Sequence, residues 1–211
     1  MKNFAIGIPT LNRADLLNQA LHHYFKIFKN TEIFIIDNGS QQILSRDHLF
    51  NIDSPSENLG VSKSWNLLCD KIFKTYDYAL ILNDDIEMGT SETAISSFVN
   101  SSEFDIARCY SQFHLCSFII TKDCFSSYRF DENFYPAYFE DRDMLYRLKL
   151  DGRKIIEHYS LNPHIFRNSQ TISHEGGDPS VNKDFSKLEK LYIDKWGGLP
   201  NQETYKTPYN R

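Results

Sequence analysis

The sequence predicts an α/β protein built on a mixed, mostly parallel central sheet with helices on both faces. Short apolar runs alternate along the chain with segments whose apolar residues recur at helical spacing. This alternation of strand and helix is typical of a parallel sheet that is covered on both sides. Three of the apolar runs end in polar clusters, which we expect to meet at the carboxyl edge of the sheet, where such folds bind ligands. The length of 211 residues fits one domain.

The first half of the chain carries the clearest alternation. The helix expected over 12–28 has apolar residues such as Leu17 and Leu21 with polar positions between them. The strand expected over 78–82 stops at two adjacent acids, and the strand over 32–36 stops at a cluster of turn formers. The elements expected here are a strand over 3–8, a helix over 12–28, strands over 32–36 and 50–52, a helix over 62–76 and a strand over 78–82.

The second half of the chain is less regular. Acidic residues favour the start of a helix expected over 139–151, because carboxylates stabilise a helix N-terminus, and Gly152 ends it. The glycine and polar content of 169–177 indicates a loop. The remaining elements expected are a helix over 92–100, strands over 113–121 and 154–157, and a helix over 183–196 that precedes an irregular tail.

The composition excludes several classes of protein. The formal net charge is −5 and no basic stripe is present, so a nucleic-acid partner is not expected. No run approaches the roughly 18 apolar residues of a membrane-spanning helix, so no transmembrane segment is expected. The four cysteines form no CxxC pair, which favours free thiols in a reducing compartment over a zinc site or a redox motif. We therefore expect a cytoplasmic protein.

The sharpest motif is the cluster Asn83, Asp84 and Asp85 at the end of an apolar run. Adjacent carboxylates repel each other, and a divalent cation removes that cost. Carboxylate oxygens are hard ligands that suit Mn²⁺ or Mg²⁺. Such a cation would bridge to the phosphates of a nucleotide. A mildly acidic protein needs this positive charge in order to bind a diphosphate. A plain turn whose carboxylates cap the next segment explains these three residues equally well.

A second acidic group contains Glu140, Asp141 and Asp143. One of these carboxylates could take the proton from an acceptor hydroxyl during group transfer, a role worth about 100- to 10,000-fold in rate. The alternative is an ordinary charged first turn of a helix. The aromatic side chains just before this group, which would line an apolar approach for a sugar, are Phe134, Tyr135, Tyr138 and Phe139.

Weaker candidates lie in the loops between these motifs. Asp37 could accept hydrogen bonds from a base or a ribose at the end of its strand, and Gly60 lets the backbone approach a ligand closely. Each also fits a plain turn. His164 and His174 follow the acidic helix, and a neutral imidazole at either position could complete the coordination of a metal. A surface or capping role is the alternative for both histidines.

In order and spacing these residues resemble the glycosyltransferase family 2 type of GT-A fold. Each motif is short and degenerate, and their order makes the match specific; the series covers about residues 4–165. The compact length is similar to that of a transferase domain of a large DNA virus of algae. The matching segments are Ile8-Pro9-Thr10-Leu11-Asn12-Arg13, Ile36-Asp37-Asn38-Gly39-Ser40, Asn58-Leu59-Gly60, Leu82-Asn83-Asp84-Asp85, Glu140-Asp141, and Gly152 with His164.

The resemblance implies an inverting, metal-dependent glycosyltransferase that moves a sugar from a UDP-sugar to a saccharide hydroxyl. It implies a single Rossmann-like domain over 1–211, in which about 1–100 bind the nucleotide sugar and about 101–211 bind the acceptor. Asp141 matches the catalytic base, with Glu140 oriented to the acceptor. Asp85 and His164 match ligands of Mn²⁺ or Mg²⁺, with His174 as the fallback. The cofactor-binding positions are Pro9, Thr10, Asn12, Arg13, Asp37, Asn38, Asn58, Gly60, Asn83 and Asp84.

The sequence departs from the family pattern at two points. Asn83 stands where a DxD-type motif has its first carboxylate. The chain also lacks the membrane segments and the QxxRW motif of processive synthases, so single sugar addition is favoured. Two other functions stay open. One is a sugar-1-phosphate nucleotidylyltransferase, although such enzymes have a glycine-rich loop after the first strand and the stretch IPTLNR contains no glycine. The other is a non-catalytic nucleotide-sugar-binding module. The sequence also leaves open whether the chain belongs to a larger multidomain polypeptide.

Overall fold

The computed structural model describes residues 4–38, 50–110, 115–166 and 184–211. Its strands are β1 (Phe4–Thr10), β2 (Ile33–Asp37), β3 (Phe50–Asp53), β4 (Tyr78–Leu82), β5 (Ile86–Met88), β6 (Ile106–Arg108), β7 (Ser117–Thr121), β8 (Ile155–Glu157) and β9 (Pro163–Phe166). Its helices are α1 (Ala14–Ile27), α2 (Gly60–Ile72), α3 (Glu92–Ser101), α4 (Lys122–Ser127), α5 (Glu140–Leu150) and α8 (Phe185–Trp196), with 3₁₀ turns η1 (Tyr159–Leu161) and η2 (Pro208–Asn210).

A seven-stranded sheet forms the centre of the molecule, in the order β3-β2-β1-β4-β7-β6-β8. β1 pairs in parallel with β2 and with β4, β2 pairs in parallel with β3, and β6 pairs in parallel with β8. β7 runs antiparallel to both of its neighbours, β4 and β6. The predicted α/β fold with a mixed, mostly parallel sheet is therefore confirmed.

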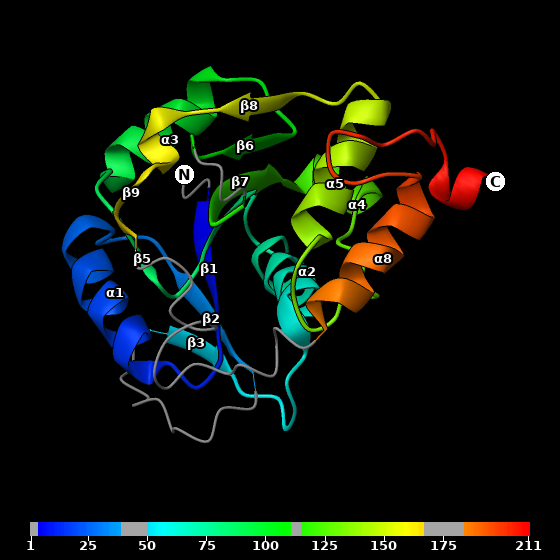
Figure 1. Cartoon of the computed structure of the whole chain (residues 1–211). Coiled ribbons are helices and arrows are strands. Elements are labelled where there is room, and N and C mark those ends of the chain that lie inside the picture. Colours follow the sequence, from blue (N-terminus) through cyan, green and yellow to red (C-terminus); the bar gives the residue numbers. More distant parts are fainter. Residues whose placement is uncertain (1–3, 39–49, 111–114, 167–183) are drawn as a thin grey trace.

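Helices cover the two faces of this sheet, with α1 and α3 on one face and α2, α4 and α5 on the other (Figure 1). β1 shows how the sequence builds this arrangement. Phe4, Ile6 and Ile8 pack into the core under α1, whereas Ala5 packs into the core under α2. Side chains alternate between the faces of a strand, so a strand that is buried on both faces is apolar throughout.

A smaller apolar cluster joins α5 to α8 beside the main sheet. Phe134 and Tyr146 pack there against Tyr192 and Trp196 of α8. The Tyr146 hydroxyl donates to the Tyr205 carbonyl oxygen, and the Tyr192 hydroxyl donates to Glu203. This cluster fixes the chain segment that leads into α5, and it therefore positions the acidic start of that helix.

Most predicted elements are present with shifts of a few residues at their ends. β7 begins at Ser117 rather than at 113, and α2 begins at Gly60 rather than at 62. The sequence did not indicate β5, β6, β9 or α4, which are each three to six residues long. The loop expected over 169–177 lies outside the described residues. Among the described helices, none combines the length and the apolar character that crossing a bilayer requires.

Candidate active site

The ends of β1, β2 and β4 meet at one edge of the sheet, as the sequence predicts. Thr10 is paired with Asp37 in the register of β1 and β2. The Thr10 hydroxyl donates a hydrogen bond of 2.7 Å to Asp84 Oδ2, and the Asn38 amide donates to the Thr10 carbonyl oxygen at 2.9 Å. Thr10, Asp37, Asn38 and Asp84 are all buried. These contacts bring together the described parts of three polar clusters; Gly39 and Ser40 lie outside the described residues.

Two buried carboxylates occupy the turn after β4, and a buried guanidinium stands at the start of α1. Asp84 and Asp85 are 4% and 3% exposed, and Arg13 is 6% exposed. Arg13 Nε and one of its terminal nitrogens donate to both carboxylate oxygens of Asp15. The pKa of Arg13 is raised by this hydrogen-bonded pair and, further, by the negative charges of Asp84 and Asp85. The arginine therefore offsets part of the repulsion between the two acids.

The loop before α2 is shaped by two asparagine side chains. Asn38 Oδ1 accepts hydrogen bonds from the Leu59 amide and the Ser64 hydroxyl, at 3.1 and 2.9 Å. Asn58 Oδ1 accepts one from the Gly60 amide at 2.8 Å. Both amide oxygens therefore hold the loop that the sequence assigns to nucleotide binding. The two asparagines support that loop from within.

Gly60 joins this loop to the segment before α5. Its φ angle is +74°, and a Cβ atom there would lie 2.8 Å from the Pro136 carbonyl oxygen. The next amide, that of Val61, donates a hydrogen bond of 2.8 Å to the same oxygen. Only glycine combines this φ with such a close backbone approach. The sequence motif around Gly60 is thus a contact between the two halves of the chain.

The remaining predicted cofactor positions surround the same edge. Pro9 pairs with Ile36 in the register of β1 and β2. Asn12 follows β1 with a φ of +55°, a left-handed conformation that asparagine tolerates better than most residues. The Asn83 amide donates to the Cys116 carbonyl oxygen at 3.0 Å, which ties the acidic turn to the start of β7.

The acidic pair Glu140 and Asp141 forms the first turn of α5. The two preceding residues, Tyr138 and Phe139, have φ angles of +87° and +70°. Left-handed backbone at two consecutive aromatic residues is strained, and such strain persists where the surrounding packing holds it. Asp141 Oδ1 accepts a hydrogen bond of 2.7 Å from the Arg142 amide. The strained segment therefore sets the direction in which both carboxyl groups leave the helix.

Burial raises the pKa of both carboxyl groups. Burial, followed by the charge of Asp141, raises the pKa of Glu140 to about 8. Glu140 Oε2 is buried and accepts no hydrogen bond within the described part of the chain. Burial also raises the pKa of Asp141, while the positive charges of Arg142 and Arg108 act in the opposite direction. The pair therefore holds a proton at neutral pH, and Glu140 is the group that carries it.

Asp143 belongs to the structure of the helix rather than to the acidic pair. Its side chain is fully buried, and Oδ1 accepts hydrogen bonds from Trp196 Nε1 at 2.9 Å and Lys195 Nζ at 2.6 Å. Arg147 Nε donates to Oδ2 at 2.8 Å. Three donors from two helices leave this carboxylate fully satisfied. Asp143 fastens α5 to α8.

The aromatic run before α5 packs mainly against α8. Phe134 is fully buried against Tyr192, and the Phe139 and Tyr138 rings contact Phe185. Tyr135 is 48% exposed. The expected apolar approach for a sugar is therefore mostly a helix-packing surface, because Phe134 and Phe139 belong to the apolar cluster that joins α5 to α8.

His164 stands apart from Asp85, contrary to the expectation of a shared metal. It lies on β9, is exposed, and its Cβ is 3.1 Å from the position of a Cβ on Gly89. Gly89 follows β5, whereas Asp85 precedes it, and a strand advances about 3.3 Å per residue. The β5–β9 pairing therefore separates the imidazole from the carboxylate. His174, the other candidate, lies outside the described residues.

The donor set still fits a divalent cation that is held partly by a nucleotide. Among the described residues, no group of three or more His, Cys, Asp or Glu side chains converges as a metal site. Asp84 and Asp85 are nevertheless buried, adjacent, hard oxygen ligands. Mg²⁺ in nucleotide enzymes is commonly bound by one or two carboxylates, with phosphates and water completing its coordination. Two protein carboxylates at this edge match that pattern.

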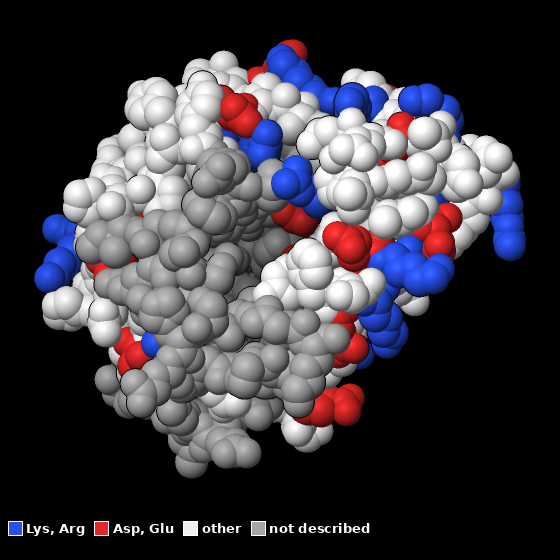
Figure 2. Space-filling model, in the orientation of Figure 1, with Lys and Arg blue, Asp and Glu red and all other residues white. Residues whose placement is uncertain are grey.

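Arginines of the second half complete the site, and the sequence did not single them out. Arg108 ends β6, forms an ion pair with Glu157, and its charge acts on Asp141. Arg142 follows Asp141 directly in the chain. Figure 2 shows this face of the molecule hollowed near its centre, with Asp or Glu residues in the wall of the hollow and Lys or Arg residues beside them. If the sequence had predicted a strand over 104–108, Arg108 would have stood at the end of that strand, where site residues are expected.

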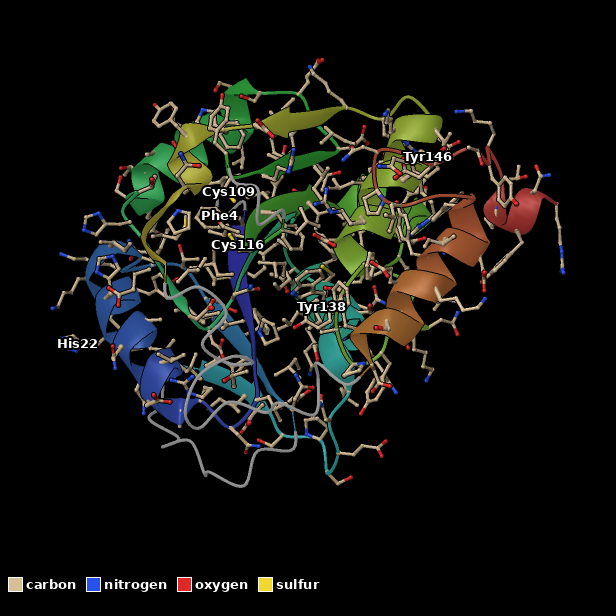
Figure 3. The ribbon with its side chains drawn as sticks, viewed as in Figure 1. Phe4, His22, Cys109, Cys116, Tyr138 and Tyr146 are labelled. Carbon is tan, nitrogen blue, oxygen red and sulfur yellow. The ribbon has the colours of Figure 1, made fainter. Side chains whose placement is uncertain are left out.

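The acidic turn after β4 adjoins the cysteine pair between β6 and β7, because the Asn83 amide donates to the Cys116 carbonyl oxygen. The charge of Asp85 acts on the Cys116 thiol, and Cys116 Sγ lies 3.5 Å from Cys109 Sγ. Arg108, which acts on Asp141, is the neighbour of Cys109 in the sequence. Figure 3 shows the two cysteines together on the β6–β7 side of the view and Tyr138 on the α2 side. The Asn38–Leu59 and Val61–Pro136 hydrogen bonds join the sheet edge to the segment before α5, and a shared site for Asp85 and Asp141 stays a prediction.

Comparison with known proteins gives one family. The model of glycosyl transferase family 2 matches residues 5–147. No curated protein sequence matches the chain significantly.

Solved structures share the fold at low sequence identity. The catalytic domain of Drosophila β1,4-galactosyltransferase 7 with xylobiose is 12% identical, with a TM-score of 0.59 and coverage of 89% of this chain and 80% of that chain. A mutant of the Drosophila enzyme with manganese, UDP-Gal and xylobiose is 11% identical, with a TM-score of 0.50 and coverage of 81% and 72%. CMP:2-keto-3-deoxy-manno-octonic acid synthetase with CTP is 8% identical, with a TM-score of 0.51 and coverage of 89% and 99%.

Proposed function

This chain belongs to glycosyl transferase family 2 and is a nucleotide-sugar glycosyltransferase, and on that premise we propose that it transfers a sugar from a UDP-sugar to a saccharide hydroxyl with inversion. The observation that carries the proposal is the meeting of Thr10, Asp37 and Asp84 at one sheet edge, to which the Asn38–Leu59 and Val61–Pro136 hydrogen bonds join the segment before α5. Single displacement needs one protein carboxylate as base and a second group that stabilises the leaving diphosphate.

Asp37 is proposed to recognise the base of the nucleotide. Its side chain is buried at the carboxyl end of β2, and its Oδ1 accepts no hydrogen bond within the described residues. A buried carboxylate oxygen without a donor is costly, so an N–H group of a ligand base is a suitable partner. The Gly60 loop lies beside it, because Asn38 links the end of β2 to Leu59. Uracil presents such an N–H group, which supports UDP.

Asp85, with Asp84 beside it, is proposed to hold Mn²⁺ or Mg²⁺ together with the donor diphosphate. A bound divalent cation stabilises negative charge on the departing diphosphate, so that no protein acid is needed there. Thr10 fixes the orientation of Asp84 through its hydroxyl. Arg13 supplies a permanent positive charge that interacts favourably with the negative charges of both acids. The manganese and UDP-Gal of the Drosophila complex support this assignment at the level of the fold.

Asp141 is proposed as the base that accepts the proton of the acceptor hydroxyl. Its pKa is raised by burial, so its carboxylate is a stronger base than one in water. Glu140, whose pKa of about 8 keeps it protonated at neutral pH, is proposed to donate a hydrogen bond to an acceptor oxygen. The two neighbours then have opposite roles, because one carboxyl group is neutral and the other is charged.

A panel of nucleotide sugars, incubated with the chain and Mn²⁺, tests the proposal. Slow release of UDP from one UDP-sugar, and its acceleration by a saccharide, are expected. The similarity to the CTP-bound synthetase makes nucleotidylyl transfer the second candidate. A parallel incubation with CTP or UTP and sugar phosphates or sugar acids would release pyrophosphate in that case. Binding of UDP without any turnover would instead support a nucleotide-sugar-binding module and refute the transferase chemistry.

A further inference from the structure

Two tyrosine rings stand out in solvent beside the ends of β6 and β8. Tyr159 is 72% exposed, the largest exposed fraction among the large hydrophobic side chains of the described residues, and Tyr110 is 59% exposed. Tyr159 opens the turn η1 directly after β8, and Tyr110 follows β6 by two residues. β6 and β8 are parallel neighbours, so both rings lie at the carboxyl edge of the sheet. Exposed aromatic rings at a ligand-binding edge call for an explanation.

Tyr159 is the outer end of a stack of rings that begins in the core. Phe104 and Phe98 are stacked with centroids 5.2 Å apart, and Phe98 and His158 are stacked at 4.0 Å. The His158 and Tyr159 ring centroids are 4.6 Å apart. A ring supported in this way is held in place before any ligand arrives. It therefore loses little conformational entropy on binding.

The backbone beneath the two tyrosines is also fixed. Asn162 closes the turn, because its amide donates to the Tyr159 carbonyl oxygen at 2.9 Å. Asn162 Oδ1 accepts a hydrogen bond of 2.7 Å from the Tyr110 amide. One asparagine therefore connects the two segments that carry the exposed rings. We call Tyr110 and Tyr159, which these linked segments carry, the tyrosine ledge.

Arg108 connects the tyrosine ledge to the candidate base. Its carbonyl oxygen accepts a hydrogen bond of 3.0 Å from the His158 amide, next to Tyr159. Its guanidinium pairs with Glu157, and its charge acts on Asp141. The Arg108 backbone therefore holds the segment that carries Tyr159 against the end of β6. The charged Arg108–Glu157 pair also offers donors and acceptors for sugar hydroxyls at the side of the ledge.

We propose that the tyrosine ledge binds a sugar unit of the acceptor saccharide other than the unit whose hydroxyl loses its proton to Asp141. This inference rests on the proposed function, and it adds that the acceptor contains at least two sugar units. The apolar C–H face of a pyranose stacks on an aromatic ring, whereas its hydroxyls bond to polar groups at the rim. Tyr159 and Tyr110 are positioning residues in this scheme, and neither takes part in the chemistry.

The test compares Tyr159→Ala, Tyr110→Ala and Tyr159→Phe with a control, Tyr209→Ala, whose ring is 43% exposed at the C-terminal turn. Initial rates are measured with monosaccharide and disaccharide acceptors, xylobiose and cellobiose among them, and donor hydrolysis is measured without acceptor. Tyr159→Ala is expected to raise KM for the disaccharide acceptor roughly tenfold, with donor hydrolysis unchanged. Tyr159→Phe and Tyr209→Ala are expected to behave as the unmodified chain does.

Binding measured without turnover separates this inference from the proposed function. Saturation-transfer NMR with the same disaccharides detects contact whether or not a donor is used. Signals that Tyr159→Ala removes and Tyr209→Ala preserves would support the ledge even if no UDP-sugar were hydrolysed. Equal disaccharide signals and equal KM in Tyr159→Ala would overturn it. So would a concentration-dependent dimer that Tyr159→Ala abolishes, because the rings would then contact a second copy of the chain.

Discussion

Thr10 Oγ1 and Asp84 Oδ2 are joined by a hydrogen bond of 2.7 Å, although 74 positions separate the two residues in the chain. The bond crosses from the end of β1 to the turn after β4, and both residues are at most 4% exposed. A buried carboxylate needs such donors in order to stay ionised. The hydroxyl therefore helps to keep Asp84 charged and in place beside Asp85.

Replacing Thr10 by valine tests this bond directly. Thr10→Val keeps the shape of the side chain but removes the donor, so we expect the free energy of unfolding to fall by about 2 kcal/mol. UDP affinity in the presence of Mn²⁺ should fall as well. Thr10→Ser keeps the hydroxyl and is the matched control. Chemical denaturation and calorimetric titration of UDP measure the two effects, and equal results for valine and serine would refute the role of the bond.

Asp85→Asn should remove the metal dependence of donor binding. Its carboxylate is the group proposed to hold the cation, and an amide is a poor substitute for it. UDP titrations with and without Mn²⁺ are expected to coincide for this variant and to differ for the unmodified chain. Asp53→Asn, at the end of β3, is a control acid at the end of another parallel strand. An unchanged manganese effect in Asp85→Asn would exclude Asp85 as a ligand.

Asp141→Asn should stop sugar transfer while the donor still binds. Loss of a general base is expected to lower the rate at least about 100-fold. Single-turnover transfer from the preferred UDP-sugar measures the rate, and UDP titration measures the donor affinity. Transfer at the normal rate would show that another group accepts the proton.

Glu140→Gln should make the free energy of unfolding less dependent on pH. The folded-state pKa of Glu140, about 8, lies above its ordinary value of 4.5, so its neutral form is the one favoured by folding. That contribution is complete below pH 4.5 and is lost as the pH rises through about 8. Glutamine stays neutral throughout. The variant should therefore match the unmodified chain near pH 5 and exceed it at about pH 9, by about 1 kcal/mol or more. A constant difference in unfolding free energy at both pH values would contradict the burial of an ionisable Glu140.

Asp143→Asn should destabilise the protein without a specific effect on transfer. The carboxylate is fully buried and pairs with Lys195 and Arg147. Breaking a buried ion pair commonly costs about 3 to 5 kcal/mol, and the remaining Asp131–Lys195 pair should keep the loss near about 3 kcal/mol. Thermal unfolding measures the loss. At a temperature where the variant is folded, kcat should be close to normal, which would separate Asp143 from Asp141.

The sequence indicated the first half of the fold well, because its strands and helices are long enough for the spacing of their apolar residues to be recognised. The β4 strand was predicted with both of its ends, and the edge where Thr10, Asp37 and Asp84 meet follows from the strand-end rule. The three-residue strands β5 and β6 show no such period. The apolar run of β7 predicts a strand but not its antiparallel direction, which depends on its neighbours.

Side-chain roles were harder to predict than element positions. His164 follows the acidic helix in the chain, but the β5–β9 pairing carries it to Gly89, and no local pattern signals that pairing. Asp143 and Asp141 look equivalent in the sequence, whereas only the former is buried beneath α8. The aromatic run before α5 is ambiguous for the same reason. Whether a ring covers a helix or meets a ligand is decided by tertiary packing.

The reversed direction of β7 gives the candidate site an additional supply of side chains. In a purely parallel sheet, each strand delivers only its last residues to the ligand edge. Because β6 and β7 are antiparallel, Cys109, which follows β6, and Cys116, which precedes β7, both lie at that edge. The Cys116 carbonyl oxygen holds the Asn83 amide, so a substitution at Cys116 should change the surroundings of Asp85 and, with them, donor binding.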